Sequence, residues 1–424
     1  MRTTARYSVR GVLIAALLLL LVMPATYGGG FYLSVVGSPS SVGTAGAANV
    51  TNRWGADSAW TNPAGMTGLD GSVIFTGQQF LIPKMEYDPS VKQGGRGDDG
   101  GNAASVALIP GIFWVTPISD RWRFGLSMVA PLGGAYDFGN HWAGRYIVQR
   151  IAMEAVGLSP AVGVQVSESV SIGFGATISF TSFEYDFAIN RAVLPGGSSK
   201  DGQARIKDAT DTGVQGFVGL QWEYSEGGVF GVVYRSELDV NLEGDVRITR
   251  LADMGLAQET DIKIEWDNPQ LLEIGIRQRL TDEWSLVVTA DWEDWSAFSN
   301  NAFTFDGSTV VTIDRKWKDT YKFAVGALWK GDTHGIGFGA SYDSSPVSDE
   351  NRTMDLPVDE QFAVGFSYVR DKDKKMNWAL SANLTWFGDG KVDQIGQGER
   401  FVGEFDKNYA MFLAFTGSYR FGRS

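Results

Sequence analysis

The segment that decides the fold is residues 408–421, NYAMFLAFTGSYRF. Its odd-numbered residues are apolar or glycine: Tyr409, Met411, Leu413, Phe415, Gly417, Tyr419 and Phe421. Most of its even-numbered residues are small or polar: Asn408, Ala410, Thr416, Ser418 and Arg420. Because successive side chains of a β-strand point to opposite faces, the segment predicts a strand with one apolar and one mostly polar face.

The same alternation recurs in residues 170–181, 284–292 and 378–386. In the last two segments a tryptophan stands at each end of the apolar face: Trp284, Trp292, Trp378 and Trp386. Aromatic residues at both edges of an apolar belt are typical of strands that cross a membrane between two water interfaces. A soluble sandwich would turn its apolar faces inward and would need no tryptophan at the strand ends.

Fourteen such segments follow one another, near Ser72, Ser105, Trp122, Val148, Val170, Thr212, Val229, Gln270, Trp284, Tyr321, Gly335, Gln361, Asn377 and Tyr409. After the leader no run of 18 apolar residues occurs, which excludes a helical membrane protein. An even number of strands can close on itself and leave no edge. The sequence therefore predicts an all-β fold, a transmembrane antiparallel β-barrel of about fourteen strands, in residues 71–424.

Connections between the predicted strands alternate in length. Short turns such as Ser119-Asp120 and Thr281-Asp282-Glu283 suit the periplasmic side. Long polar segments at residues 83–102, 194–211, 239–268 and 300–316 suit the cell exterior. We expect these long segments to be extracellular loops.

Residues 1–28 have the order of a secretory signal peptide: Arg2, Arg6 and Arg10, then an apolar run, then small residues. Removing these three arginines takes the formal charge from −13 to −16, because the leader has no acidic residue. An acidic chain is a poor nucleic-acid binder. The chain has no cysteine, so its stability after export depends on noncovalent contacts.

Residues 29–70 are rich in Gly, Ala, Ser, Thr and Asn and lack a sustained helical or strand period. By composition this could be a disordered linker. Trp54, Trp60 and the helix-sized piece at residues 45–60 instead indicate a packed plug inside the barrel, because such aromatic side chains are costly to leave in water. Asn62-Pro63-Ala64-Gly65 then reads as a turn.

The chain resembles the outer-membrane long-chain fatty acid transporters of the FadL type (OMPP1/FadL/TodX), a family that includes importers of aromatic hydrocarbons. The resemblance rests on the early Phe31, on Asn62-Pro63-Ala64 before the first strand, and on five later motifs. These are Trp292-Glu293-Asp294-Trp295-Ser296, Trp317-Lys318-Asp319-Thr320, Tyr342-Asp343-Ser344-Ser345-Pro346-Val347, Asn351-Arg352-Thr353 and Leu356-Pro357.

This resemblance implies that residues 29–70 form a hatch, with Phe31, Asn62, Pro63 and Ala64 at the gate. It also implies a lateral opening where the third strand kinks. The residues themselves support a kink at Pro131, Gly133 and Gly134, because proline removes a ladder hydrogen bond and glycine permits a bulge. An ordinary strand end is the alternative.

The aromatic-rich loop after this kink offers Tyr136, Phe138, Trp142 and Tyr146 as candidates for an external ligand groove. The same loop could instead cover the barrel mouth. A carboxylate headgroup would need a lumen-facing cation, for which Arg123, Lys322 and Arg420 are the candidates. Pairing within a lumen network is the alternative role, and a neutral arene or alkane would need no cation.

Enzymatic chemistry finds little support in the sequence. The two histidines, His141 and His334, are explained by loop and girdle positions, and their spacing suits neither a phospholipase nor a protease. Asp98 and Asp99 are too few oxygen ligands for a hard cation. We expect no catalytic residues, no cofactor and no metal.

Two hypotheses from different classes follow. The first is a passive outer-membrane channel for hydrophobic compounds, most of all long-chain fatty acids, with aromatic hydrocarbons or alkanes as the alternative substrates. The second is a structural or surface-recognition barrel that acts through its acidic loops. Both place a monomer in the outer membrane of a Gram-negative cell, in contact with lipid and lipopolysaccharide and not with nucleic acid.

Overall fold

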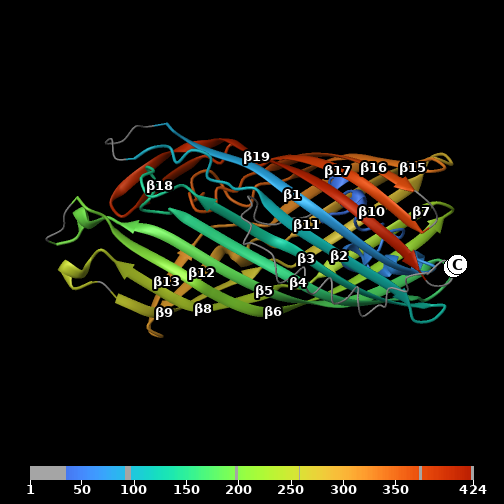
Figure 1. The fold of residues 1–424 in the computed structure, drawn as a ribbon, viewed down its shortest axis with the longest axis horizontal. Coiled ribbons are helices and arrows are strands. Elements are labelled where there is room, and N and C mark those ends of the chain that lie inside the picture. Colours follow the sequence, from blue (N-terminus) through green and yellow to red (C-terminus); the bar gives the residue numbers. More distant parts are fainter. Residues whose placement is uncertain (1–34, 91–96, 196–198, 257, 372–374, 422–424) are drawn as a thin grey trace, which may run out of the picture.

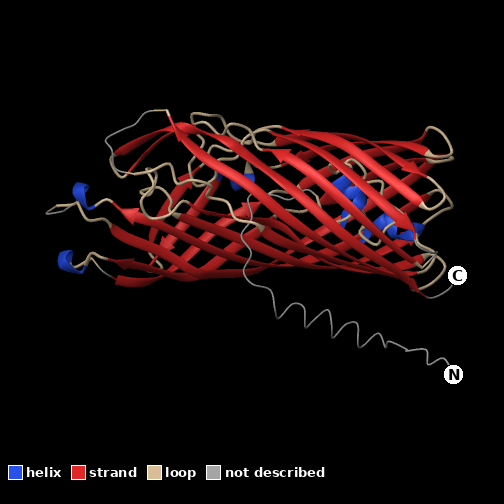
Figure 2. Cartoon of the chain, turned by 45° about the horizontal axis from the view of Figure 1, so that its top comes forward, coloured by secondary structure: helices blue, strands red, loops and turns tan. Residues whose placement is uncertain are grey.

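The computed structural model describes residues 35–90, 97–195, 199–256, 258–371 and 375–421. Over these ranges the chain forms a closed antiparallel β-barrel of fourteen strands, as the alternation predicted (Figures 1 and 2). Its strands are β1 Ser72–Pro89, β2 Ala107–Pro117, β3 Trp122–Asp137, β4 Arg150–Gln165, β5 Val170–Ile189, β6 Gly202–Ser225, β7 Gly228–Arg235, β10 Leu271–Arg279, β11 Trp284–Glu293, β14 Thr320–Lys330, β15 His334–Asp343, β16 Gln361–Asp371, β17 Met376–Trp386 and β19 Glu399–Phe421.

The barrel closes where β1 pairs with β19, from Ser72 opposite Phe421 to Pro89 opposite Gly403. Each of the fourteen segments picked out by alternation corresponds to one barrel strand. Among the described residues, no helix is both long and apolar enough to cross a membrane.

Five further strands extend one end of the barrel: β8 Leu238–Thr249, β9 Gln258–Asn268, β12 Asn300–Phe305, β13 Thr309–Asp314 and β18 Val392–Gly396. We call this the outer end and the opposite end, which has the short turns, the inner end (Figure 1). Two of the long segments expected to be loops are therefore largely β-hairpins. In residues 239–268 the alternation explains this, because Val240, Leu242, Ile262 and Ile264 all lie buried on one face.

The outward face of the barrel is apolar. In β19 Phe415 is 54% exposed and Leu413 is 37% exposed, whereas the intervening Ala414 is 3% exposed. The same pattern holds in β17, where Leu380 and Leu384 are exposed and Ala379 is buried. Exposed apolar side chains at every second position give the barrel the surface that lipid requires.

Residues 35–70, which we call the plug, lie inside the barrel toward the inner end (Figure 2). The plug contains α2 Pro39–Gly43, α3 Ser58–Thr61 and the 3₁₀ helix η1 Pro63–Gly68. Residues 45–60 are thus not one helix. The positive φ angles of Ala45 and Gly46, 52° and 89°, end the helical turn of α2, and α3 begins only at Ser58. Three 3₁₀ turns lie elsewhere: η2 Arg191–Val193, η3 Ala252–Met254 and η4 Ala297–Ser299.

Glycines on the barrel wall let the plug backbone approach the strands closely. A Cβ atom at Gly219 would lie 2.1 Å from Asn62 Oδ1, and one at Gly339 would lie 2.4 Å from the Thr44 carbonyl oxygen. The glycine belt comprises Gly77, Gly173, Gly219, Gly231, Gly339 and Gly365, each on a different strand. Two pairs of its members sit opposite each other across the ladder, Gly173 with Gly219 and Gly339 with Gly365. Only glycine leaves room at these positions for the plug backbone or, at Gly219, for the Asn62 side chain.

Candidate functional site

An apolar cavity of about 470 Å³ lies in the outer half of the barrel. Side chains of β4, β5, β6, β8, β9, β12, β13, β18 and four connecting segments line it: Tyr146, Ile147, Ile151, Met153, Phe183, Tyr185, Phe187, Ile189, Ala204, Ile206, Val246, Ile248, Trp266, Phe298, Asn301, Phe303, Phe305, Val311, Ile313, Arg315, Thr353, Asp355, Leu356 and Gln394. Its volume and mostly apolar lining are those of a small-molecule binding site.

Aromatic side chains hold the shape of this cavity. Phe183 and Trp266 contact each other edge to face with ring centroids 5.7 Å apart, and Trp266 contacts Phe298 in the same way at 6.2 Å. Phe298 also packs against Trp317 at 4.8 Å. Such pairs restrain one another, so the cavity wall is preformed.

One ion pair interrupts the apolar lining. Arg315, directly after β13, donates from Nη2 to Asp355 Oδ2 at 2.9 Å and from Nη1 to Asp355 Oδ1 at 3.3 Å. Its Nη1 also donates to Thr353 Oγ1 at 2.9 Å, and its Nε donates to Asn301 Oδ1. The Arg315 and Asp355 side chains are only 5% and 6% exposed. Burial acts to raise the pKa of Asp355, but the Arg315 guanidinium outweighs it and holds that pKa below its ordinary value.

The other polar side chains on the lining also have partners. Tyr185 donates to the Ile147 carbonyl, and Gln394 accepts from the Met354 amide. Tyr146 donates to Asp201, and Asn301 Nδ2 donates to the Phe298 carbonyl. The polar side chains at the edge of the cavity are therefore hydrogen-bonded within the protein, and the rest of the lining is apolar.

Asn62 of the predicted gate fastens the plug to the barrel wall. Its side chain accepts from the Ala64 amide at 3.1 Å and donates to the carbonyls of Val50 at 2.7 Å and Leu220 of β6 at 3.2 Å. Pro63 and Ala64 begin the 3₁₀ helix η1 against Gly163 and Gly173. Phe31, the fourth predicted gate residue, lies outside the described residues.

Further contacts attach the plug around the barrel. Thr289 of β11 donates to the Ala47 carbonyl at 2.8 Å, and Gln221 of β6 donates to the Val50 and Asn52 carbonyls. Arg235 of β7 donates to the Trp60 carbonyl and stacks on the Trp60 ring at 4.0 Å. The plug is thus hydrogen-bonded to strands on several sides.

The predicted kink coincides with a break in the barrel ladder. The β3–β4 register shifts between Val129 and Leu132, which is a bulge that contains Pro131. The β2–β3 ladder ends at Ile112 opposite Met128, so residues 107–111 and 129–135 lie beyond it, and an isolated bridge joins Ala104 to Tyr136 farther out. Gly133 and Gly134 lie within this stretch and pair with Glu154 and Met153 of β4.

The four predicted external groove residues are all buried in one apolar cluster: Tyr136, Phe138, Trp142 and Tyr146. Phe138 stacks on Trp142 with ring centroids 4.0 Å apart. Tyr146 borders the cavity.

The three predicted headgroup cations do not line the cavity. Arg123 donates to the Leu69 carbonyl at 2.7 Å and so anchors the end of the plug. Lys322 is buried 3.4 Å from Asp291, and Arg420 is exposed on β19 near the inner end. The cavity's cation is instead Arg315, which sequence reasoning missed. Arg315 lies two residues before the Trp317-Lys318-Asp319-Thr320 motif, and Asp355 lies between the Asn351-Arg352-Thr353 and Leu356-Pro357 motifs, so those motifs were the available signal.

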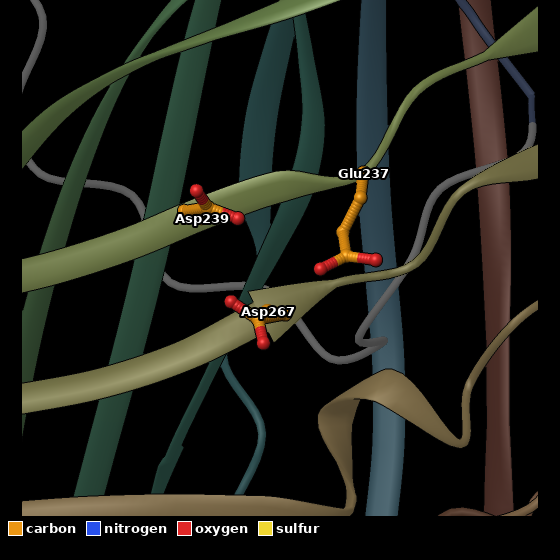
Figure 3. A group of neighbouring side chains, drawn as sticks. All are labelled: Glu237, Asp239 and Asp267. Atoms are coloured by element: carbon orange, nitrogen blue, oxygen red, sulfur yellow. The ribbon is translucent and has the colours of Figure 1, made fainter.

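An acidic cluster lies on the outer face of the wall. The carboxylates of Glu237, Asp239 of β8 and Asp267 of β9 lie within 4.8 Å of one another (Figure 3). Burial and the nearby Asp267 and Asp239 carboxylates raise the pKa of Glu237. These three groups alone do not define a metal site.

A closed fourteen-stranded barrel with a lipid-facing apolar surface, a filled inner half and an apolar cavity in its outer half defines a plugged outer-membrane barrel. The family model described as outer membrane protein transport protein (OMPP1/FadL/TodX) matches residues 19–421. The chain belongs to this family, whose members are transport proteins of the Gram-negative outer membrane.

Individual relatives agree with this assignment. The long-chain fatty acid transport protein of Escherichia coli K12 is 23% identical over 359 residues, which cover 76% of this chain and 80% of that protein. The fold is similar to a crystal structure of a Pseudomonas aeruginosa FadL homologue, with a TM-score of 0.86, 20% identity, and coverage of 93% of this chain and 100% of that one. It is also similar to the Pseudomonas putida toluene transporter TodX, with a TM-score of 0.68, 15% identity, and coverage of 87% and 95%.

Proposed function

We propose that this protein is a passive transporter that brings hydrophobic compounds across the outer membrane. The observation that carries the proposal is the apolar cavity of about 470 Å³ in the outer half of a barrel whose inner half is filled. A polar water-filled pore gives an apolar solute no favourable contacts, whereas this cavity can collect such a solute by burial. Each buried methylene contributes roughly 0.8 kcal/mol.

The exit route we propose is lateral, through the break between β2 and β3. Ile151 and Met153 line the cavity and pair with Tyr136 and Gly134 of β3, so one strand separates the cavity from the break. The plug's many hydrogen bonds favour this route over passage through the inner end. In this proposal the segment around Phe31 acts as the gate, and residues 29–70 form the hatch.

Two substrate classes have support from relatives. The curated relatives named long-chain fatty acid transport proteins favour fatty acids. The structural neighbours titled toluene transporters or monoaromatic hydrocarbon channels favour neutral hydrocarbons. The charge of the cavity bears on this choice.

Uptake in whole cells tests the proposal. Cells that lack this protein should take up radiolabelled hexadecane, palmitate or toluene more slowly than cells that carry it, for at least one of the three. Equal uptake of all three would contradict a transport function and leave the surface-recognition alternative, in which the acidic loops act.

Deleting Pro131 tests the lateral route, because it removes the extra residue of the bulge and lets β3 pair in continuous register with β4. We expect uptake to fall several-fold while the purified protein still binds its ligand. Pro131→Ala keeps the chain length and is the control. Unchanged uptake after the deletion would argue against this exit.

A further inference from the structure

The Arg315–Asp355 pair has the geometry of a guanidinium bound to a carboxylate ligand, except that the carboxylate belongs to the protein. Both Asp355 oxygens accept from Arg315, at 2.9 and 3.3 Å. This two-point arrangement is the one by which arginine recognises free carboxylates. Thr353 and Asn301 accept from the same guanidinium, so each of its three nitrogens donates to the protein.

We propose that Asp355 occupies the carboxylate-binding position of the cavity and thereby selects uncharged hydrophobic ligands over fatty acid anions. The proposal rests on the proposed transport function and concerns which substrates the same cavity accepts. Asp355 is in this view the specificity-determining residue, and Arg315 is the cation that it neutralises.

Charge explains the selection. Arg315 is the one cationic residue among the described residues that line the cavity, and Asp355 is the one acidic residue. A ligand carboxylate that approached Arg315 would meet the Asp355 carboxylate in a site where both side chains are about 95% buried. Two carboxylates that share a buried site repel each other, so one of them would have to take up a proton or leave.

Over the part of the chain that the structure describes, the rest of the lining offers a charged headgroup no second cation. Tyr146, Tyr185, Asn301, Thr353 and Gln394 each have a hydrogen-bond partner within the protein. An uncharged ligand needs no such partner, because apolar burial alone favours its binding.

The loop that supplies Asp355 is held firmly in place. Arg352, three residues earlier, is 2% exposed and donates to the carbonyls of Val358 and Lys391, each at 2.8 Å. It also pairs with Asp359 at 2.8 Å. A ligand anion therefore cannot displace Asp355 merely by swinging a free loop aside.

The test compares palmitate with methyl palmitate, two ligands of the same chain length that differ in charge. Binding to the purified full-length protein in lipid nanodiscs at pH 7.5 is followed by tryptophan fluorescence, since Trp266 lines the cavity. We expect the wild-type protein to bind the ester at least tenfold more tightly than the acid. Asp355→Asn should tighten palmitate binding at least tenfold and leave ester binding within threefold.

Glu350→Gln is the matched control, because it removes an exposed carboxylate from the same loop and leaves the contacts of Arg352 and Arg315 in place. It should keep the wild-type preference for the ester. If Asp355→Asn does not fold, the double variant Arg315→Met/Asp355→Leu removes both charges together. It should bind the ester and still bind palmitate weakly.

The outcomes separate this inference from the proposed function. Wild-type protein that binds palmitate as tightly as the ester, or a double variant that prefers palmitate, would overturn the inference and leave the transport function standing. Wild-type protein that binds neither ligand would overturn the inference, while the proposed function would be overturned only by equal uptake of hexadecane, palmitate and toluene with and without the protein.

Discussion

In the described part of this barrel, two ion pairs are deeply buried. Arg315 pairs with Asp355 in the outer half, and Lys322 pairs with Asp291 at 3.4 Å in the inner half, with all four side chains at most 6% exposed. Removing one partner of such a pair leaves an uncompensated charge away from water, which is far more costly than removing both.

The Arg315–Asp355 pair should make the stability of the protein depend on pH in the acid range. Because the folded-state pKa of Asp355 lies below its ordinary value of 3.8, the unfolded chain binds its proton first as the pH falls. The stabilisation by the pair is complete above pH 3.8 and is lost as the pH falls through the lowered pKa. We expect the difference in melting temperature between the wild-type protein and Asp355→Asn to be large at pH 7 and to shrink below pH 3.8. A constant difference between pH 7 and pH 3 would contradict this.

Replacing Lys322 should lower the stability of the folded barrel. A Cβ at Gly46 of the plug would lie 3.2 Å from Lys322 Nζ, and the carboxylates of Asp291, Asp343 and Glu293 all act on this ammonium group. Lys322→Met should lower the free energy of unfolding by about 3–5 kcal/mol, because Asp291 remains buried without its partner. Denaturant titration of the protein in lipid vesicles measures this. The double variant Lys322→Met/Asp291→Leu should recover part of the loss, because Asp343 and Glu293 still lack their cation, and a double variant as unstable as the single one would refute the explanation.

The plug and the barrel strands fit each other through the glycine belt defined above. Each belt glycine belongs to a strand that is otherwise ordinary, yet together the glycines form a surface on which irregular backbone can pack without side chains between. Hydrogen bonds from Asn62, Thr289 and Gln221 then satisfy plug groups that water cannot reach. The plug can therefore adopt this conformation only because the strands carry glycine at the belt positions.

A bulky side chain in the glycine belt should displace the plug from the barrel wall. Gly219→Val would place its Cβ against Asn62 Oδ1, and such overpacking typically costs about 1–3 kcal/mol. We expect proteases to cleave the plug of the folded variant faster than that of the wild-type protein. Gly417→Val, also on a barrel strand, meets no atom within 4 Å and should behave like the wild type. Equal cleavage of both variants would count against the belt.

The complete barrel combines a closed wall, a filled inner half and a cavity in its outer half. A fourteen-stranded wall encloses a lumen too wide for its own side chains to fill. The plug fills the inner half, and the aromatic cluster of β9, η4 and the segment before β14 narrows the outer half. A solute that enters at the outer end thus meets an apolar cavity above a filled inner half rather than a water-filled channel.

Deleting residues 35–70 tests this arrangement. Without the plug, the polar inward-facing side chains of the inner half would border water, and the barrel should conduct ions. In planar lipid bilayers we expect steady ohmic conductance for the deletion variant and almost none for the wild-type protein. Heat-modified mobility on gels checks that the variant still forms a barrel, and a folded variant that does not conduct would show that other elements close the lumen.

The period-two alternation was sufficient to predict the barrel and its fourteen strands, because lipid on one side and a mostly polar lumen on the other act on every strand separately. Pro131 by itself was sufficient to predict a kink in β3, where the register with β4 shifts, because a proline acts on its own strand. Each of these inferences depends only on neighbours in the chain.

The arrangement of the cavity depends on the tertiary structure. Arg315 and Asp355 are 40 residues apart and look like ordinary charged loop residues until folding buries them together. The sequence instead favoured Arg123 and Lys322 as headgroup cations, and folding pairs these with the plug backbone and with Asp291. Which cation meets a ligand and which meets the protein is decided by contacts between distant segments, and no local period encodes those contacts.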